Sequence, residues 1–173
     1  MSLLSDRDLK SLLSAGKLVV EPLDKNINPT SIDLRLGSTL IQYTDPIIRL
    51  DTKPKYKEID ITSEGYLLAP GEFVLGMTKE IVSIPNGYQG FIETKGNIAR
   101  AGIQVHNGDG HIDPGFSGNI TLEICNMHRN GSSILLAPDI YVCQLFVYKL
   151  SSECDAPYKG RYSGHRKPTI YIP

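Results

Sequence analysis

The chain alternates short apolar runs with glycine and proline over most of its length. From residue 18 onward the segments between these turn formers are only a few residues long, and many are β-branched or alternate apolar with polar positions. This pattern is typical of short strands joined by turns. It predicts strands at residues 18–20, 31–36, 39–43, 73–77, 81–84, 89–92, 120–124, 134–136 and 140–148. We therefore expect an all-β sandwich or barrel and not a succession of βαβ units.

The N-terminal segment has a different, helical pattern. Ser5 is placed to cap a helix, Asp8 lies in its first turn, and leucines follow at helical spacing until Gly16 provides a stop. Residues 51–65 are charged and have little periodicity, which indicates a surface excursion. The polar tail from Ser151 to Pro173 has the composition of a disordered end. Its tyrosines and cations also suit a flap that closes over a ligand.

Length and composition indicate an ordinary soluble protein. The 173 residues fit one domain, residues 1–173, with 151–173 as its tail or flap. A hydrophobic share of 40%, a charged share of 21% and a net charge of −1 argue against a nucleic-acid partner. No apolar stretch approaches a bilayer span, and the N-terminus lacks the pattern of a signal peptide, so we expect no membrane partner.

The cysteines and histidines indicate reduced thiols and no metal centre. Cys125, Cys143 and Cys154 are an odd number without CxxC spacing, which is typical of a cytoplasmic protein and not of a disulfide framework. Two of them lie in apolar runs and are interpreted as small buried hydrophobic residues. The four histidines have no HxH or HxxxH spacing near these cysteines, so we expect no zinc and no other protein-bound metal.

Candidate chemistry is concentrated in residues 90–126, where charges lie at turns and strand ends. Lys95 to Arg100 place two cations at the possible start of a short helix, whose free N–H groups would bind an anion such as phosphate. A plain surface turn with solvated charges is the alternative. Asp113 begins a turn with Pro114 and Gly115, where its carboxylate either caps the turn by an Asx bond or accepts a ligand hydroxyl.

Glu123 lies inside a strand whose apolar residues all fall on the other face. Alternation places Asn119, Thr121, Glu123 and Cys125 together, opposite Ile120, Leu122 and Ile124. An outward glutamate is usually only solvated. If this face lines a cleft, partial desolvation would raise the carboxyl pKa and suit it to proton transfer.

Several motifs resemble the dCTP deaminase family of the trimeric dUTPase-like superfamily. They are SIDLRLG (31–37), GFIETKGNIARAGI (90–103), HIDPGFSGNITLEICN (111–126), Gln144 in CQLFVY, and APYKGRY (156–162). The resemblance covers nearly the whole chain. It implies a distorted β-barrel or jelly-roll of the dUTPase-like type, a homotrimer, and sites between subunits that the C-terminal tail closes. The implied reaction converts dCTP to dUTP and ammonia without zinc, with Mg²⁺ on the substrate phosphates.

The resemblance also implies roles for single residues. Glu123 would shuttle protons for a water that attacks C4 of cytosine, Arg100 would hold that water and the base, and Asp113 would accept the deoxyribose 3′-hydroxyl. The implied nucleotide-binding residues are Lys95, Gly96, Asn97, Ile98, Ala99, Arg100, Asp113, Thr121, Leu122, Glu123, Gln144, Tyr158, Arg161 and His165.

The chain departs from the family pattern at Gly96 and Asn97. The family has two serines there, and the first normally hydrogen-bonds in the water and amine site. A third departure is Asp109, where the family usually has a small residue. Loss of one such hydrogen bond costs roughly 10²–10³ in rate. Three functions therefore stay open: a dCTP deaminase, a dUTP diphosphatase that acts alone or in addition, and a trimeric nucleotide-binding protein that has lost catalysis.

Overall fold

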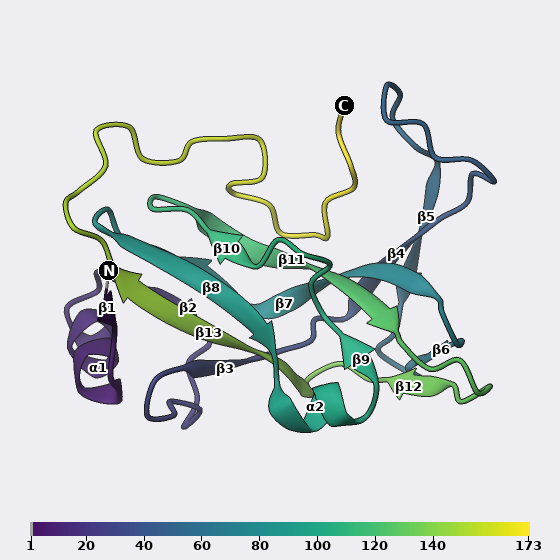
Figure 1. Cartoon of the computed structure of the whole chain (residues 1–173), viewed down its shortest axis with the longest axis horizontal. Coiled ribbons are helices and arrows are strands. Elements are labelled where there is room, and N and C mark those ends of the chain that lie inside the picture. Colours follow the sequence, from purple (N-terminus) through teal and green to yellow (C-terminus); the bar gives the residue numbers. More distant parts are fainter. Residues whose placement is uncertain (1) are drawn as a thin grey trace.

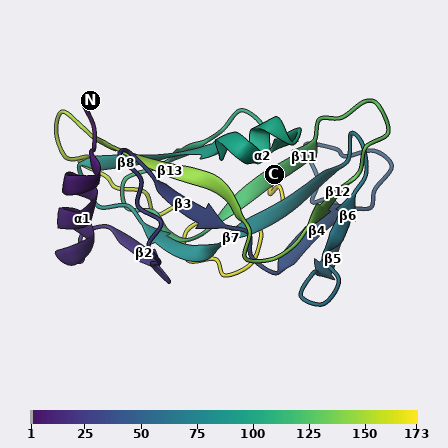
Figure 2. The ribbon, with the colours of Figure 1, turned by 90° about the horizontal axis from the view of Figure 1, so that it is seen from below.

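A computed structural model describes residues 2–173, and it is built almost entirely of short antiparallel strands. The molecule is elongated. Helix α1 lies at one end, and strands β5, β6 and β12 lie at the other end, as both ribbon views show (Figure 1, Figure 2). Helix α1, the longest in residues 2–173, has nine residues, far fewer than the roughly 20 that cross a bilayer.

Helix α1 spans Asp6–Ser14, as the sequence predicts. Asp6 and Asp8 occupy its first turn, and Leu9 is fully buried. Ser5 holds the N-cap position, but its hydroxyl lies 3.4 Å from the Asp8 carboxylate and caps no backbone group. Gly16 ends the helix with φ of +64°, a left-handed conformation that glycine adopts at little cost.

The strands form three sheets. The first sheet contains β1 (Ser2–Leu3), β13 (Tyr141–Lys149), β8 (Tyr88–Thr94) and β10 (His111–Ile112), with β3 (Ile32–Arg35) paired to β13. The second contains β5 (Tyr56–Asp60), β4 (Thr39–Tyr43), β7 (Phe73–Ser83), β11 (Ser117–Asn126) and β9 (Ile103–Gln104), with β2 (Val19–Glu21) paired to β7. The third pairs β6 (Tyr66–Leu68) with β12 (Ile134–Leu136). The expected barrel is therefore not closed among residues 2–173.

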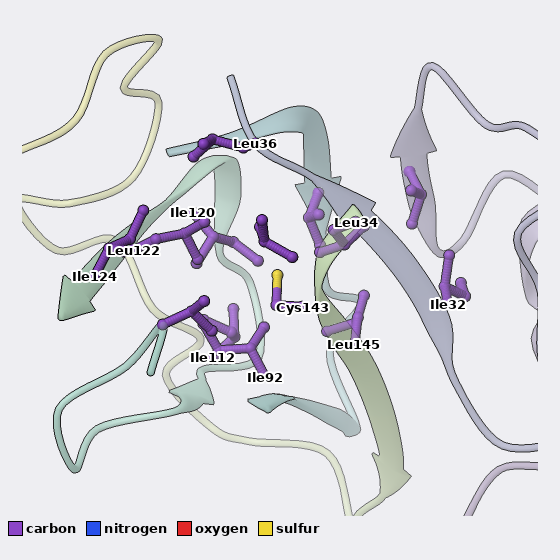
Figure 3. Close-up of a cluster of buried hydrophobic side chains, with 14 of the residues drawn as sticks. Ile32, Leu34, Leu36, Ile92, Ile112, Ile120, Leu122, Ile124, Cys143 and Leu145 are labelled. Carbon is purple, nitrogen blue, oxygen red and sulfur yellow. The ribbon is translucent and has the colours of Figure 1, made fainter. Parts of the chain in front are cut away.

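The core lies between the first two sheets. Ile120, Leu122 and Ile124 of β11 point toward Cys143 and Leu145 of β13, and all five side chains are buried (Figure 3). Burial raises the pKa of the Cys143 thiol above its usual range. All three cysteines are free, as the sequence predicts.

Alternation along the two central strands sets which side chains reach the outside. Because Leu122 and Ile124 point into the core, Glu123 between them points away from it on the outer face of the second sheet. Because Cys143 and Leu145 point into the core, Gln144 points away on the outer face of the first sheet. The predicted face of Glu123 is thus confirmed, and Gln144 lies on the opposite outer face of the sandwich.

The tail, residues 151–173, contains no helix or strand but crosses the second sheet. It runs along the upper side of the molecule in Figure 1, above β10 and β11. Hydrogen bonds join it to the N-terminal part of β11: Gly164 donates to the Ser117 carbonyl at 2.6 Å, and Asn119 donates to the His165 carbonyl at 3.1 Å. The tail therefore forms an additional layer over the outer face that carries Glu123.

Candidate active site

A cavity of about 670 Å³ lies between the tail and the outer face of the second sheet. Its polar wall from the body of the chain contains Asp109, His111, Asp113, Asn119, Thr121 and Glu123. Tyr43, Phe73, Leu75, Ile112, Phe116 and Ile120 provide less polar surface. The tail contributes Tyr158, Gly160, Arg161, Tyr162, Thr169, Ile170 and Tyr171. Carboxylates, one guanidinium and tyrosines thus meet in a space large enough for a small molecule.

Glu123 is held in the cavity wall by the loop that leads from β9 to β10. The Asn107 backbone N–H donates to Glu123 Oε2 at 2.7 Å, and the Glu123 N–H donates to the Val105 carbonyl at 2.9 Å. One carboxylate oxygen is therefore fixed by a backbone donor, and the residue has a defined orientation toward the cavity. The sequence analysis made a proton-transfer role conditional on this face lining a cleft, and Glu123 does line the cavity.

Asp113 begins the predicted turn. Gly115 has φ of +89°, the left-handed value that a type II turn needs at its third residue, and the Phe116 N–H donates to the Asp113 carbonyl at 3.1 Å. Within residues 2–173 the Asp113 carboxylate makes no Asx bond. Its nearest charged neighbour is His111 Nε2, at 3.8 Å. The Asx alternative is thus wrong, and the carboxylate lies free in the cavity wall.

The end of the tail closes the cavity through two backbone donors. The Tyr171 N–H donates to the Tyr43 hydroxyl at 2.9 Å, and the Thr169 N–H donates to Thr121 Oγ1 at 3.1 Å. Ile170, between these two residues, is buried next to β4 and β7. Burial raises the pKa of the Tyr43 hydroxyl above its usual value.

The remaining tail residues of the predicted set are divided. Tyr158 and Arg161 line the cavity. The Arg161 guanidinium donates to the carbonyls of Ile172 and Pro173 at 2.9 and 3.1 Å. His165 lies outside the cavity wall, with Nε2 2.7 Å from the Arg161 carbonyl. The structure therefore does not place the His165 side chain at the cavity.

A second polar cluster lies on the first sheet and at the end of β8. Lys95 precedes helix α2 (Gly96–Arg100), so the predicted short helix is confirmed. Lys95 Nζ contacts Asp33 Oδ2 at 2.5 Å, and Gln144 Nε2 donates to Asp33 Oδ1 at 2.9 Å. A single buried carboxylate thus holds together a cation and an amide that the sequence assigns to the triphosphate.

Helix α2 exposes most of its residues to solvent. Gly96, Asn97, Ala99 and Arg100 are exposed, and Ile98 packs against the core. A Cβ atom added at Gly96 would lie 3.3 Å from Arg100 Nη1, a close approach that a flexible guanidinium accommodates by a small shift. The absence of a serine here therefore leaves space beside Arg100.

The predicted residues thus form two groups that do not meet within one chain. Asp113, Thr121, Glu123, Tyr158 and Arg161 line the cavity, whereas residues 95–100 and Gln144 contribute nothing to its wall. The Leu122 side chain points into the core, and only its backbone belongs to the cavity-facing strand. In Figure 1, α2 lies on the lower side and the tail lies on the upper side.

The sequence prediction missed several residues of the two clusters, and Asp33 and Asn107 are two of them. Asp33 lies within the SIDLRLG motif, where a carboxylate between buried Ile32 and Leu34 is itself the signal of a specific partner. Asn107 acts through its backbone N–H, and no side-chain pattern marks such a donor. Within residues 2–173, no three His, Cys, Asp or Glu side chains form a group suited to holding a metal ion.

Comparison with known proteins gives one consistent family. A family model described as dCTP deaminase-like matches residues 3–150. A Dictyoglomus thermophilum protein named "dCTP deaminase, dUMP-forming" is 40% identical over 183 residues, covering 96% of this chain and 92% of that protein. A Rhodococcus erythropolis protein with the same name is 39% identical over 180 residues, covering 96% and 94%.

Solved structures show the same fold. The 2′-deoxycytidine 5′-triphosphate deaminase from Agrobacterium tumefaciens superposes with a TM-score of 0.66 at 21% identity. The match covers 84% of this chain and 47% of that one, so this chain spans about half the length of that protein. A Staphylococcus bacteriophage 80alpha dUTPase superposes with a TM-score of 0.50 at 17% identity, covering 84% and 90%. The family model and the relatives near 40% identity together establish that the chain belongs to the dCTP deaminase-like family.

Proposed function

We propose that this protein deaminates dCTP and cleaves the resulting dUTP, releasing ammonia, diphosphate and dUMP. The observation that carries the proposal is the oriented Glu123 carboxylate in a cavity that Asp113 and the tail also line. The sequence alone favoured dUTP as the product and kept dUTP cleavage as an alternative. The relatives are named "dCTP deaminase, dUMP-forming", and these names favour the combined reaction.

In the deamination step Glu123 transfers protons between water and the leaving amine. Its carboxylate removes a proton from a water molecule, and the water oxygen bonds to C4 of cytosine while the C4=N3 π electrons move to N3, which takes that proton from the carboxyl. The carboxylate then takes the remaining hydroxyl proton and gives it to the C4 amino group, and the C4–N bond breaks as C4=O forms and ammonia leaves. The Asn107 N–H, at 2.7 Å, keeps the carboxylate oriented during both transfers. Arg100 is proposed to hold the water and the base.

The second step is attack of water on the α-phosphorus of dUTP, which breaks the bond to the β-phosphate oxygen. Asp113, with no Asx bond to satisfy it, is available to accept the sugar 3′-hydroxyl. The tail residues Thr169 to Tyr171 cover part of the cavity through their contacts with Thr121 and Tyr43, and a bound nucleotide would displace water from the remainder. Exclusion of water strengthens the electrostatic contacts within the site.

The complete site is proposed to form between neighbouring copies in a homotrimer. Glu123 and Gln144 point to opposite outer faces of one sandwich, so the two predicted halves cannot enclose one nucleotide within a single chain. A neighbouring copy that docks its α2 and Gln144 against the cavity would add Lys95 and Arg100 to the carboxylates. This arrangement requires a heterologous interface, which closes a ring in a trimer.

Mg²⁺ is proposed to enter with the triphosphate. The carboxylate of the second polar cluster, Asp33, already binds Lys95 and Gln144. Asp33 is therefore not free to hold a metal ion, and the triphosphate would carry Mg²⁺, which would neutralise charge on the phosphates. Lys95 and Gln144 would contact the same phosphates.

Gly96 favours a second candidate, a nucleotide-binding protein without turnover, because the side chain that normally hydrogen-bonds in the water site is missing. Product analysis with dCTP, CTP and dUTP in the presence of Mg²⁺ separates the candidates. Conversion of dCTP to dUMP supports the proposal, and accumulation of dUTP supports deamination alone. Cleavage of dUTP without conversion of dCTP supports a diphosphatase, and tight binding without any product supports the non-catalytic candidate.

A further inference from the structure

Three titratable side chains at alternate positions line the cavity beside Glu123: Asp109, His111 and Asp113. Asp109 lies between Gly108 and Gly110 in the loop after β9, and His111 is the first residue of β10. Gly110 fixes this loop against the first sheet, because a Cβ atom there would lie 2.5 Å from the Ile92 carbonyl oxygen. The backbone that leads into His111 is therefore held against the first sheet, while the His111 side chain is about half exposed.

The imidazole lies between two carboxylates. His111 Nδ1 contacts Asp109 Oδ1, and His111 Nε2 lies 3.8 Å from Asp113 Oδ1. The second distance exceeds the hydrogen-bond range of about 2.7–3.2 Å. His111 thus contacts Asp109 directly, whereas the gap between His111 and Asp113 is too wide for a direct hydrogen bond.

A hydroxyl group has the chemistry to fill this gap. Its oxygen accepts from one donor while its hydrogen goes to one acceptor. An oxygen about 2.8 Å from both His111 Nε2 and Asp113 Oδ1 satisfies the usual hydrogen-bond distance to each. Nδ1 contacts Asp109 Oδ1, so the opposite ring nitrogen is the one directed at this hydroxyl, where an Nε2–H would donate to it while Asp113 Oδ1 accepts its hydrogen. The other charged side chains that line the cavity are Glu123 and Arg161.

We propose that His111, oriented by Asp109, forms with Asp113 a donor–acceptor pair that binds one sugar hydroxyl of the nucleotide. This inference rests on the proposed function, in which Asp113 accepts the 3′-hydroxyl. It adds His111 as a specificity-determining residue and Asp109 as the residue that positions it. A site built to hydrogen-bond a hydroxyl rejects an analogue that lacks it, because its polar groups are then left unpaired.

The test is a cycle of enzyme variants against dCTP and 2′,3′-dideoxycytidine triphosphate, which lacks the 3′-hydroxyl. For His111→Ala we expect kcat/KM for dCTP to fall about tenfold, mainly through KM, because one hydrogen bond to the substrate is lost. The value for the dideoxy substrate should change by less than about twofold, since that substrate makes no such bond. His111→Gln, whose amide keeps an N–H donor, should recover part of the dCTP loss.

The controls separate a binding role from a structural one. Asp109→Ala should lower kcat/KM for dCTP by a smaller factor and should leave the value for the dideoxy substrate nearly unchanged. His128→Ala removes an imidazole that contacts the Ala101 carbonyl outside the cavity, and it should change kcat/KM for neither substrate. Equal losses on both substrates, or no loss on dCTP, would overturn the inference and leave the proposed function intact. A wild-type protein that neither binds nor converts dCTP, measured by calorimetry and product analysis, would overturn both.

Discussion

Glu123 has the two properties that a proton-transferring carboxylate needs, a fixed orientation and an open path to a ligand. Alternation along β11 points it away from the core, and the Asn107 N–H fixes one oxygen. Gly96 is the opposite case, because it has no side chain to donate or accept a hydrogen bond, and a Cβ atom there would lie 3.3 Å from Arg100 Nη1. The chemistry of the site therefore depends on single residues that the fold itself does not require.

Glu123→Gln should lower the rate of deamination by about 10³-fold or more, because the amide cannot take a proton from water. The amide oxygen can still accept the Asn107 N–H, so the melting temperature should stay close to that of the wild type. Ammonia release from dCTP and a thermal melt measure the two effects. Turnover above about a tenth of the wild-type rate would be incompatible with the proton-shuttle role.

Glu80 is a fully buried carboxylate that binds the Arg35 side chain at 2.7 Å and the Arg35 backbone N–H at 2.8 Å. This hydrogen bond raises the pKa of Arg35. Glu80→Ala leaves a largely buried guanidinium without its main partner, so the free energy of unfolding should fall by about 3 kcal/mol. Urea unfolding at fixed protein concentration measures the change.

The matched control is Glu58→Ala, which removes an ion pair with Lys167 that is largely exposed. Exposed pairs contribute little to stability. If Glu80→Ala destabilised the protein no more than this control, the buried pair would not be the stabilising contact described above.

At the scale of elements, sequence periodicity gave most strands and missed those that polar residues interrupt. Residues 39–43 form β4 as predicted. The predicted strands at 73–77 and 81–84 are one strand, β7. Thr78 and Glu80 lie between them as buried polar residues, satisfied by hydrogen bonds and an ion pair, and so they interrupt the apolar pattern without interrupting the strand. Residues 51–65 contain the edge strand β5, which is charged and exposed on both faces and so shows no alternation.

Contacts between distant segments were not predictable from local patterns. Lys95 and Asp33 are 62 residues apart, and the sequence showed each residue but not the pairing. The Asp113 turn, in contrast, depends on four consecutive residues and was predictable in its backbone form. Its free carboxylate was not, because the choice between an Asx bond and an open side chain depends on the neighbouring loop and tail.

The tail should affect nucleotide binding more than it affects folding. Removing residues 168–173 deletes Thr169, Ile170 and Tyr171 from the cavity wall. We expect the Kd for dCTP to rise by about tenfold or more, whereas the melting temperature should fall by only about 5 °C, because the packing lost is mainly that of two buried side chains, Pro168 and Ile170. Calorimetry measures the Kd for dCTP. The control variant is Lys167→Ala, which leaves the cavity wall unchanged. An unchanged Kd would show that the tail does not close the site.

At the scale of the whole molecule, the two outer faces of one sandwich carry the two groups of residues that the proposed function assigns to one nucleotide site. The tail-covered face has Asp113 and Glu123, and the other face has Gln144 with Lys95 at its edge. Helix α2 brings Arg100 to the second half. A ring of copies that places one face against the other would bring the carboxylates and the cations together at each interface.

The most direct test of this central claim is complementation between two inactive variants. Glu123→Gln and Arg100→Ala chains, carrying different tags, are unfolded and refolded together, and mixed oligomers are isolated through both tags. If each site takes Glu123 from one copy and Arg100 from its neighbour, every mixed trimer has one site of its three with both residues intact, so the isolated mixed trimers restore about a third of wild-type deamination. Glu123→Gln mixed with Asp113→Ala is the control, and it should restore nothing because both residues belong to the same half. Recovery in the first mixture alone is the predicted result. Mixed oligomers no more active than either parent would contradict a site shared between neighbouring copies.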